Sequence, residues 1–251
     1  MDLLTRRSKS ATILASVTPT QGGHMGLLLM VAAAWAVCPE FLPDEYATDE
    51  HSSGRVIMVV KDEHLLGVYE NDRLMAGTCV SITMGSASQE GTKQKRGDNR
   101  TPEGWYKISH RNPYSQFHKS LGINYPNFDD VMRARLSGLI DHHTSNTLVE
   151  AINKGRLPAQ DTVLGGDIFL HGNPGNWTND WTWGCVALRN TDMDALYRLG
   201  DPGTAVLILS KLPEVPEIIT VDLTALYPTR YGPYLEEVRD ASIAEQKSVE
   251  P

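Results

Sequence analysis

The sequence predicts a mainly β fold, a β-sandwich-like pair of sheets with a few inserted helices. Short apolar and β-branched runs such as Val56–Val60 recur along the chain between turn residues, a pattern typical of antiparallel strands. Helical spacing is confined to a few segments. The 251 residues, 41% of them hydrophobic and 22% charged, provide enough apolar material for one large domain.

Strands are expected wherever a β-type run lies between turn signals. The residues Glu70, Asn71 and Asp72 form such a turn, and the alternating run that follows it places Cys79 inside a strand as a small buried side chain. The expected strands are Val56–Val60, Leu65–Tyr69, Leu74–Met84, Trp105–Ile108, Gly166–Leu170 and Ala205–Leu209.

Helices are expected over Asp129–Leu139, Thr144–Lys154 and Thr191–Leu199. Gly155 is a stop signal for the second helix, and Thr191 is the expected N-cap of the third.

The N-terminal segment resembles a secretory signal. Basic residues near the start precede an apolar stretch of about a dozen residues, Gly26–Val37, which holds an A-x-A cleavage pattern at Ala34-Trp35-Ala36. The alternatives are an uncleaved membrane anchor, a lipoprotein processed at Cys38, and a misassigned start with a buried apolar segment. The predicted organisation is a signal peptide or anchor over 1–37, a linker over 38–54, a catalytic domain over 55–211 and a C-terminal extension over 212–251 with a frayed polar tail. We therefore expect an exported protein of the periplasm or cell envelope, cleaved or tethered to the inner membrane.

Charge and cysteine content exclude some classes of protein. The 23 basic and 31 acidic residues give a net charge of −8, which argues against a nucleic-acid partner. The chain has three cysteines and no CxxC pair, which argues against a zinc knuckle. An odd number leaves at least one thiol free or joined to another chain.

The stretch Gly166–Asn190 holds the residues that suggest chemistry. His171 ends a predicted strand, a loop follows, and Cys185 comes directly after Gly184. A cysteine nucleophile reacts as its thiolate and needs a base within hydrogen-bond reach. The amides of Gly184 and Cys185 are candidates to bind the developing oxyanion.

These residues resemble the YkuD-type L,D-transpeptidase family, whose motif is His-Gly, a loop, and then Ser or Thr, one residue, Gly-Cys and an aliphatic residue. Here it reads His171-Gly172 and Thr182-Trp183-Gly184-Cys185-Val186. The blocks 97–106, 111–113 and 120–127 also resemble the family, and the similar region runs from about residue 55 to residue 209.

The resemblance implies an enzyme of cell wall biogenesis or remodelling that needs no cofactor or metal. Cys185 is expected to attack the diaminopimelate carbonyl of a peptidoglycan stem peptide and to form a thioester, which an amine or water then resolves. His171 is the expected base, the carbonyl of Gly172 orients it, and Gly184 lies at the oxyanion site. The expected substrate-binding residues are Thr182, Trp183, Arg189, Tyr114 and His118.

Two departures leave the reaction outcome open. Trp183 stands where many members carry His, and Ala187 stands where many carry Arg. Alternatives to transpeptidation are therefore an L,D-carboxypeptidase, a hydrolase of wall cross-links, and a catalytically silent wall-binding module. A zinc peptidase that uses Asp141-His142-His143 is a weaker alternative, because adjacent histidines point in different directions.

Aromatic residues near Cys185 allow two interpretations. Trp177, Trp181 and Trp183 either form a wall that holds the stem peptide or its sugars, or pin the loop by packing. Arg111 and Phe117, like Tyr114 and His118, either line the substrate cleft or have a structural role.

Overall fold

The structure, a computed structural model, describes residues 13–19, 25–31, 37–47, 54–173, 175 and 179–213. Besides a 3-10 turn at Ser88–Glu90, its helices are α2 (Phe128–Leu136), α3 (His142–Asn153) and α4 (Asn190–Leu199). Its strands are β1 (Ile13–Pro19), β2 (Met25–Val31), β3 (Arg55–Val60), β4 (Leu65–Glu70), β5 (Arg73–Leu74), β6 (Val80–Ser81), β7 (Gly104–Ser115), β8 (His118–Ile123), β9 (Phe169–Asn173), β10 (Val186–Arg189) and β11 (Ala205–Leu209).

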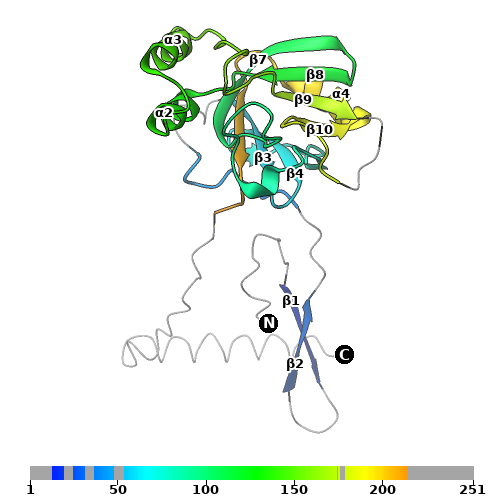
Figure 1. The fold of residues 1–251 in the computed structure, drawn as a ribbon. Helices are drawn as coiled ribbons and strands as arrows, with labels where there is room; N and C mark the ends of the chain where they lie inside the picture. The colour runs from blue at the N-terminus through cyan, green and yellow to red at the C-terminus, as the bar shows by residue number, and fades with distance from the viewer. Residues whose placement is uncertain are drawn as a thin grey trace. The chain divides into compact units, whose positions relative to one another are not determined.

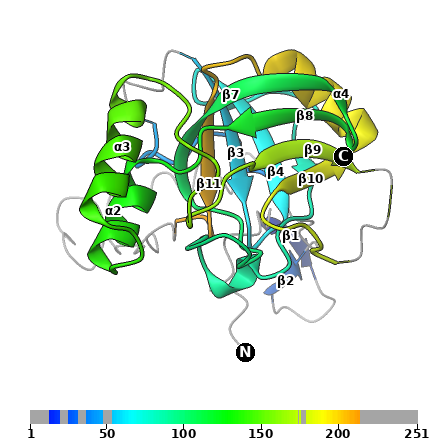
Figure 2. The same ribbon diagram turned by 45° about the horizontal axis from the view of Figure 1, so that its top comes forward.

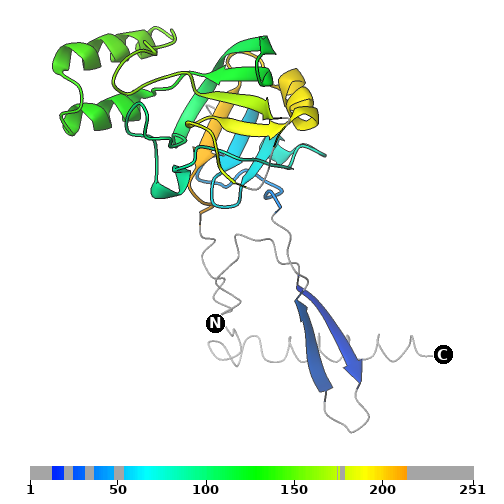
Figure 3. The ribbon, with the colours of Figure 1, turned by 45° about the vertical axis from the view of Figure 1, so that its right-hand side comes forward.

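Nine strands form one continuous mixed sheet in the order β10-β9-β8-β7-β11-β3-β4-β5, with β6 paired to β4. The sheet curls, so that β8, β9 and β10 lie across β3 and β4 while α2 and α3 stand to one side (Figures 1, 2 and 3). The long strand β7 belongs to both halves, because it pairs with β11 on one side and β8 on the other. The predicted mainly β, sandwich-like fold is confirmed.

The largest apolar cluster lies between the two halves of the curled sheet. Its side chains come from β3 and β4, from β7 to β11 and from α4, and include Ile57, Leu170, Val186 and Met193. A second cluster covers the outer face of β3 and β11, and a third joins α2 to α3. Along β9 and β10 it is Leu170, Val186 and Leu188 that face this core, so the residues between them lie on the opposite face of these strands.

Most predicted elements are present, but several details were wrong. The expected strand Leu74–Met84 is two short strands, and Cys79 precedes β6 at a partly exposed position. Thr191 lies inside α4, whose N-cap position is Arg189. Strand β7 runs well beyond Ile108, and β11 and β10 pair in parallel with β3 and β9, which short-range alternation does not reveal.

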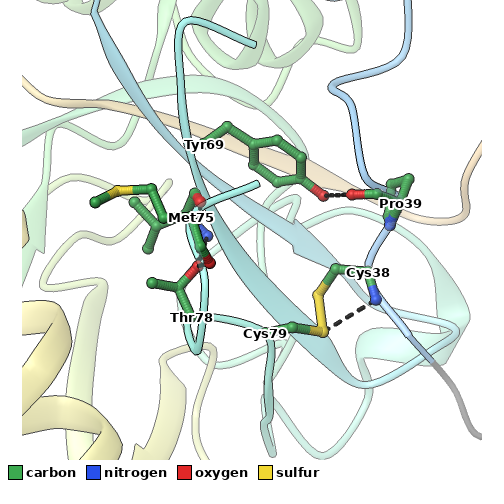
Figure 4. Close-up of a disulfide and its surroundings, with 7 residues drawn as sticks. Cys38, Pro39, Tyr69, Met75, Thr78 and Cys79 are labelled. Atoms are coloured by element: carbon green, nitrogen blue, oxygen red, sulfur yellow. Dashed lines mark hydrogen bonds between the residues drawn. A yellow bond between two sulfur atoms is a disulfide. The ribbon is translucent and has the colours of Figure 1, made fainter. Parts of the chain in front are cut away.

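A disulfide joins Cys38 to Cys79 and fastens an N-terminal strap, residues 38–47, to the domain (Figure 4). The hydroxyl of Tyr69 donates to the carbonyl of Pro39, and Leu42 is 2% exposed within the outer cluster. The strap also exchanges backbone hydrogen bonds with Asp72, in the turn between β4 and β5, and with Leu74 of β5. Cys79 is thus half of a disulfide and not the small free hydrophobe that its sequence position suggested.

The predicted N-terminal apolar stretch overlaps β2, which pairs with β1 in a separate two-stranded antiparallel sheet. The predicted cleavage pattern, residues 34–36, and the C-terminal extension from residue 214 lie outside the described residues. Within the described part of the chain, no helix is long and apolar enough to cross a bilayer.

Candidate active site

The register of β9 and β10 brings the predicted base and nucleophile to one face of the sheet. The strands are parallel, with His171 opposite Ala187, and Cys185 directly precedes β10. Because side chains alternate between faces, Cys185 lies on the same side as His171 and Ala187. The intervening residues Leu170 and Val186 point the other way, into the main core.

That face opens into a cavity of about 350 Å3. Besides Cys185 and His171, its walls come from β9 and from the hairpin between β7 and β8. Ser120 of β8 lies directly opposite His171 in the antiparallel register. The remaining lining residues are Asn112, Ser115, Gln116, Phe117 and Phe169.

His171 is 3% exposed and held in one orientation. Its Nδ1 lies 2.8 Å from the carbonyl oxygen of Gly172. Since a carbonyl only accepts, Nδ1 carries the proton and Nε2 is left as an acceptor. Phe117 stacks on the imidazole with ring centroids 4.7 Å apart, and Trp181 meets it edge-on at 5.9 Å. Burial lowers the pKa of His171 although the Gly172 contact opposes it, so the imidazole is neutral and basic at pH 7.

Cys185 is the free cysteine of the chain and is partly exposed. Its Sγ donates weakly to the carbonyl oxygen of Asp167 at 3.6 Å. Burial raises the pKa of this thiol to about 11. Cys185 is therefore a protonated thiol at neutral pH, in the same cavity as a neutral imidazole, and it would have to lose its proton to act as a nucleophile.

The turn that leads to Cys185 is held by hydrogen bonds that bear on the predicted oxyanion site. The Gly184 N–H donates to Thr182 Oγ1 at 3.2 Å, and that hydroxyl donates to the Cys185 carbonyl at 2.6 Å. The Gly184 amide is therefore already engaged, and Thr182, 4% exposed, braces the turn from inside. Glycine is required at 184 for its backbone: φ is +129°, and a Cβ there would lie 2.6 Å from the Arg100 carbonyl oxygen. The Cys185 amide stays the candidate oxyanion donor.

The other predicted substrate-binding residues do not line this cavity. Trp183 is 82% exposed beside the turn, and Tyr114 is 93% exposed near the hairpin tip. His118 Nε2 lies 2.8 Å from an Asp194 oxygen on α4, and Arg189 is exposed at the end of β10. Trp177 lies outside the described residues.

Most of the wall residues were not predicted from the sequence as site residues. Asn112 and Ser120 fall within the blocks 111–113 and 120–127 that resemble the family, but no site role was expected for them, nor for Ser115, Gln116 or Phe169. Phe117 was expected only as a candidate with a structural alternative. The available signal was the Asn112–Ser120 stretch between two β-type runs, which could have been recognised as a hairpin. Arg111, by contrast, has a structural role: it bonds Asp201 and the Tyr197 carbonyl and stacks over the Tyr197 ring.

Asp141 caps α3 by accepting the Thr144 N–H, and His142 contacts Asn146. These partners give the Asp-His-His run a local structural role. Over the residues that the structure describes, no cluster of three or more His, Cys, Asp or Glu could hold a metal.

A family model described as the L,D-transpeptidase catalytic domain, YkuD, matches residues 54–208. Among solved structures, Pgp2 from Campylobacter jejuni, named as a helical cell shape determining protein, is 20% identical with a TM-score of 0.44, over 68% of this chain and 55% of that one. Bd1075 from Bdellovibrio bacteriovorus is 23% identical with a TM-score of 0.45, over 72% and 56%. An L,D-transpeptidase from Xylanimonas cellulosilytica is 16% identical with a TM-score of 0.37, over 64% and 63%. The chain thus spans little more than half the length of the first two structures. A comparison with curated proteins found no match.

Proposed function

Because the chain belongs to the YkuD family of L,D-transpeptidase catalytic domains, we propose that it is a peptidoglycan L,D-transpeptidase in which Cys185 forms a thioester with the diaminopimelate carbonyl of a stem peptide. The observation that carries this proposal is the shared face of β9 and β10, where a free thiol and a buried neutral imidazole line one cavity.

The proposed acylation follows from the protonation states. His171 Nε2 takes the thiol proton as Sγ attacks the carbonyl carbon, and the charge that develops on oxygen is stabilised by the Cys185 amide. The imidazolium then gives this proton to the amine of the leaving D-alanine, which releases it and leaves the thioester. An acceptor amine or a water molecule then attacks the thioester carbonyl and gives its proton to His171. The C–S bond breaks, and the imidazolium returns that proton to the leaving Sγ, which restores the Cys185 thiol and the neutral imidazole.

The cavity wall favours hydrolysis as a second candidate outcome. Among the described residues that line it there is no Lys or Arg, and the nearby Ala187 is fully buried. The charge of Lys93 acts on Cys185, but Lys93 is paired with Asp98 and does not line the cavity. A free carboxylate of an acceptor stem therefore meets no cation among these lining residues, whereas water needs none. L,D-carboxypeptidase or cross-link hydrolase activity is therefore the alternative to transfer.

We also propose that the protein is exported to the periplasm or cell envelope, as a cleaved product or with an inner-membrane tether. The Cys38–Cys79 disulfide supports export, because disulfides persist mainly in oxidising compartments. It also argues against lipidation of Cys38, whose sulfur is already bonded. A fusion reporter active only outside the cytoplasm tests this, and an inactive reporter on a stably expressed fusion would contradict it.

The decisive experiment incubates the purified protein with tetrapeptide muropeptides and separates the products. Cross-linked dimers indicate transfer, and tripeptides with free D-alanine indicate carboxypeptidase activity. Mass spectrometry of the protein is run in parallel to detect an acyl group on Cys185. Binding of muropeptides without any adduct or product would favour a silent wall-binding module.

A further inference from the structure

The segment that carries the nucleophile is anchored by a carboxylate that the proposed chemistry does not use. Asp180 precedes Trp181 and Thr182 and is largely buried, with 13% of its side chain exposed. Its Oδ1 accepts the Met84 N–H at 2.9 Å, and its Oδ2 lies 3.1 Å from His64 Nε2. His64 belongs to the turn between β3 and β4, far away in the sequence.

These contacts form a clamp, a set of hydrogen bonds that holds the backbone of Met84. The Met84 carbonyl accepts the N–H groups of both Trp181 and Thr182, while the Met84 N–H is held by Asp180. Met84 is fully buried in the main core, so it is a fixed reference point. Asp180 therefore holds the start of the catalytic segment against the rigid part of the sheet.

The clamp reaches both catalytic groups. Thr182 braces the Gly184–Cys185 turn, and Trp181 packs against the ring of His171. A small displacement of Asp180 would therefore shift both the Cys185 thiol and the Trp181 ring that packs against His171. A misplacement of reacting groups by about 1 Å is enough to slow a reaction greatly.

We propose that Asp180 and His64 form a positioning pair whose charge attraction sets the alignment of Cys185 with His171 and weakens at alkaline pH. For turnover of wall peptides this inference rests on the proposed function, but the pair itself is testable without a substrate.

The contacts between Asp180 and His64 favour the charged form of both side chains. The hydrogen bond to Asp180 raises the pKa of His64 against the opposing effect of burial, and nearby Asp62 acts in the same direction as Asp180. Burial acts to raise the pKa of Asp180, but the bonds from His64 and Met84 outweigh it and the net shift is downward, with Lys61 helping. Both residues are charged between pH 3.8 and pH 6.5, because the pKa of Asp180 lies below this window and that of His64 above it, and the attraction is lost as pH rises through the raised pKa of His64.

The test measures the alkylation rate of Cys185 by iodoacetamide between pH 5.5 and 9, using the oxidised protein so that Cys185 is the one free thiol. The sulfur displaces iodide and loses its proton, so no wall substrate is required. The variant His64→Gln keeps a neutral hydrogen-bond donor to Asp180. We expect the wild-type rate to exceed the H64Q rate by about two- to fivefold near pH 6, with the ratio approaching one near pH 9.

Two further variants keep the result interpretable. Asp180→Asn retains an acceptor for Met84 and loses the charge, so its rate should also fall at pH 6. His142→Gln, on exposed α3 with a neutral Asn146 contact, is the matched histidine control and should equal wild type throughout. A wild-type to H64Q ratio of one at every pH, or a deficit that does not change with pH, would overturn the proposal. If the wild-type protein does not turn over muropeptides but the ratio of the wild-type and H64Q alkylation rates still changes with pH, only the proposed function is contradicted.

Discussion

The two sides of the active-site cavity are built by different means. The floor, β9 and β10 with His171 and Cys185, is fixed by parallel strand register and by short bonds within the catalytic segment. The opposite wall is the tip of the β7–β8 hairpin, where the register shifts and His118 adopts a positive φ of 74°. An ion pair from Lys119 to Asp194 and a polar contact of His118 with the same carboxylate hold this hairpin to α4. The groups proposed to make bonds thus lie on the parallel strands β9 and β10, and the groups that would select a substrate lie on the neighbouring hairpin, whose tip is held by contacts to α4.

The largest effect is expected at the floor. Replacing Cys185 with Ala should abolish acylation and turnover, a loss of roughly a thousandfold or more, because no other described thiol is free. Muropeptide turnover and intact-protein mass report the result. An unchanged melting temperature shows that the loss is chemical, and retained turnover would refute the assignment of the nucleophile.

His171→Gln should lower the acylation rate by about a hundredfold to ten-thousandfold, since the thiol with its raised pKa then has no base. In the wild-type protein the same rate should fall with decreasing pH through the lowered pKa of His171, below 6.5. Acylation assays quenched at set times and repeated across pH measure both effects. An acid limb at or above pH 6.5 would contradict the neutral, desolvated imidazole.

Phe117→Ala removes the ring that stacks on His171 from the hairpin side. We expect an intermediate loss in acylation of roughly tenfold, together with an acid limb shifted toward higher pH as water reaches the imidazole. The pH profile separates this from simple loss of binding. A rate loss without any shift would mean that Phe117 contacts the substrate and does not shield the base.

The smallest effect is expected at the wall itself. Gln116→Ala deletes one neutral polar contact and should raise KM about threefold with little change in kcat. The same truncation at Tyr114 tests the sequence-based choice of that residue, which points to solvent on the same hairpin. If Tyr114→Ala has the larger effect on KM, the substrate follows the outer edge of the hairpin and not the cavity.

The contrast also explains which features the sequence could predict. The strands β3, β4 and β11 and the three helices were recognisable because local apolar spacing encodes them, and the family was recognisable from blocks around His171 and Cys185. The Cys38–Cys79 pairing was not, because it joins residues 41 positions apart. The lining residues of the hairpin were not predicted, because Asn112, Ser115 and Gln116 have no spacing that marks them as site residues. Only the fold brings them close to His171. The hydrogen bond of the Gly184 amide depends on the orientation of the Thr182 hydroxyl, which the sequence motif does not specify.

The N-terminal strap has a mechanical consequence. Cys38 is the point at which the preceding chain meets the domain, and its sulfur is bonded to the segment that leads into β6. A pulling force on the N-terminal side therefore enters the domain through a covalent bond. The hydrogen bonds of residues 39–47 carry little of that force and are not broken in succession. The sheet, with the face that holds His171 and Cys185, can therefore stay folded under tension.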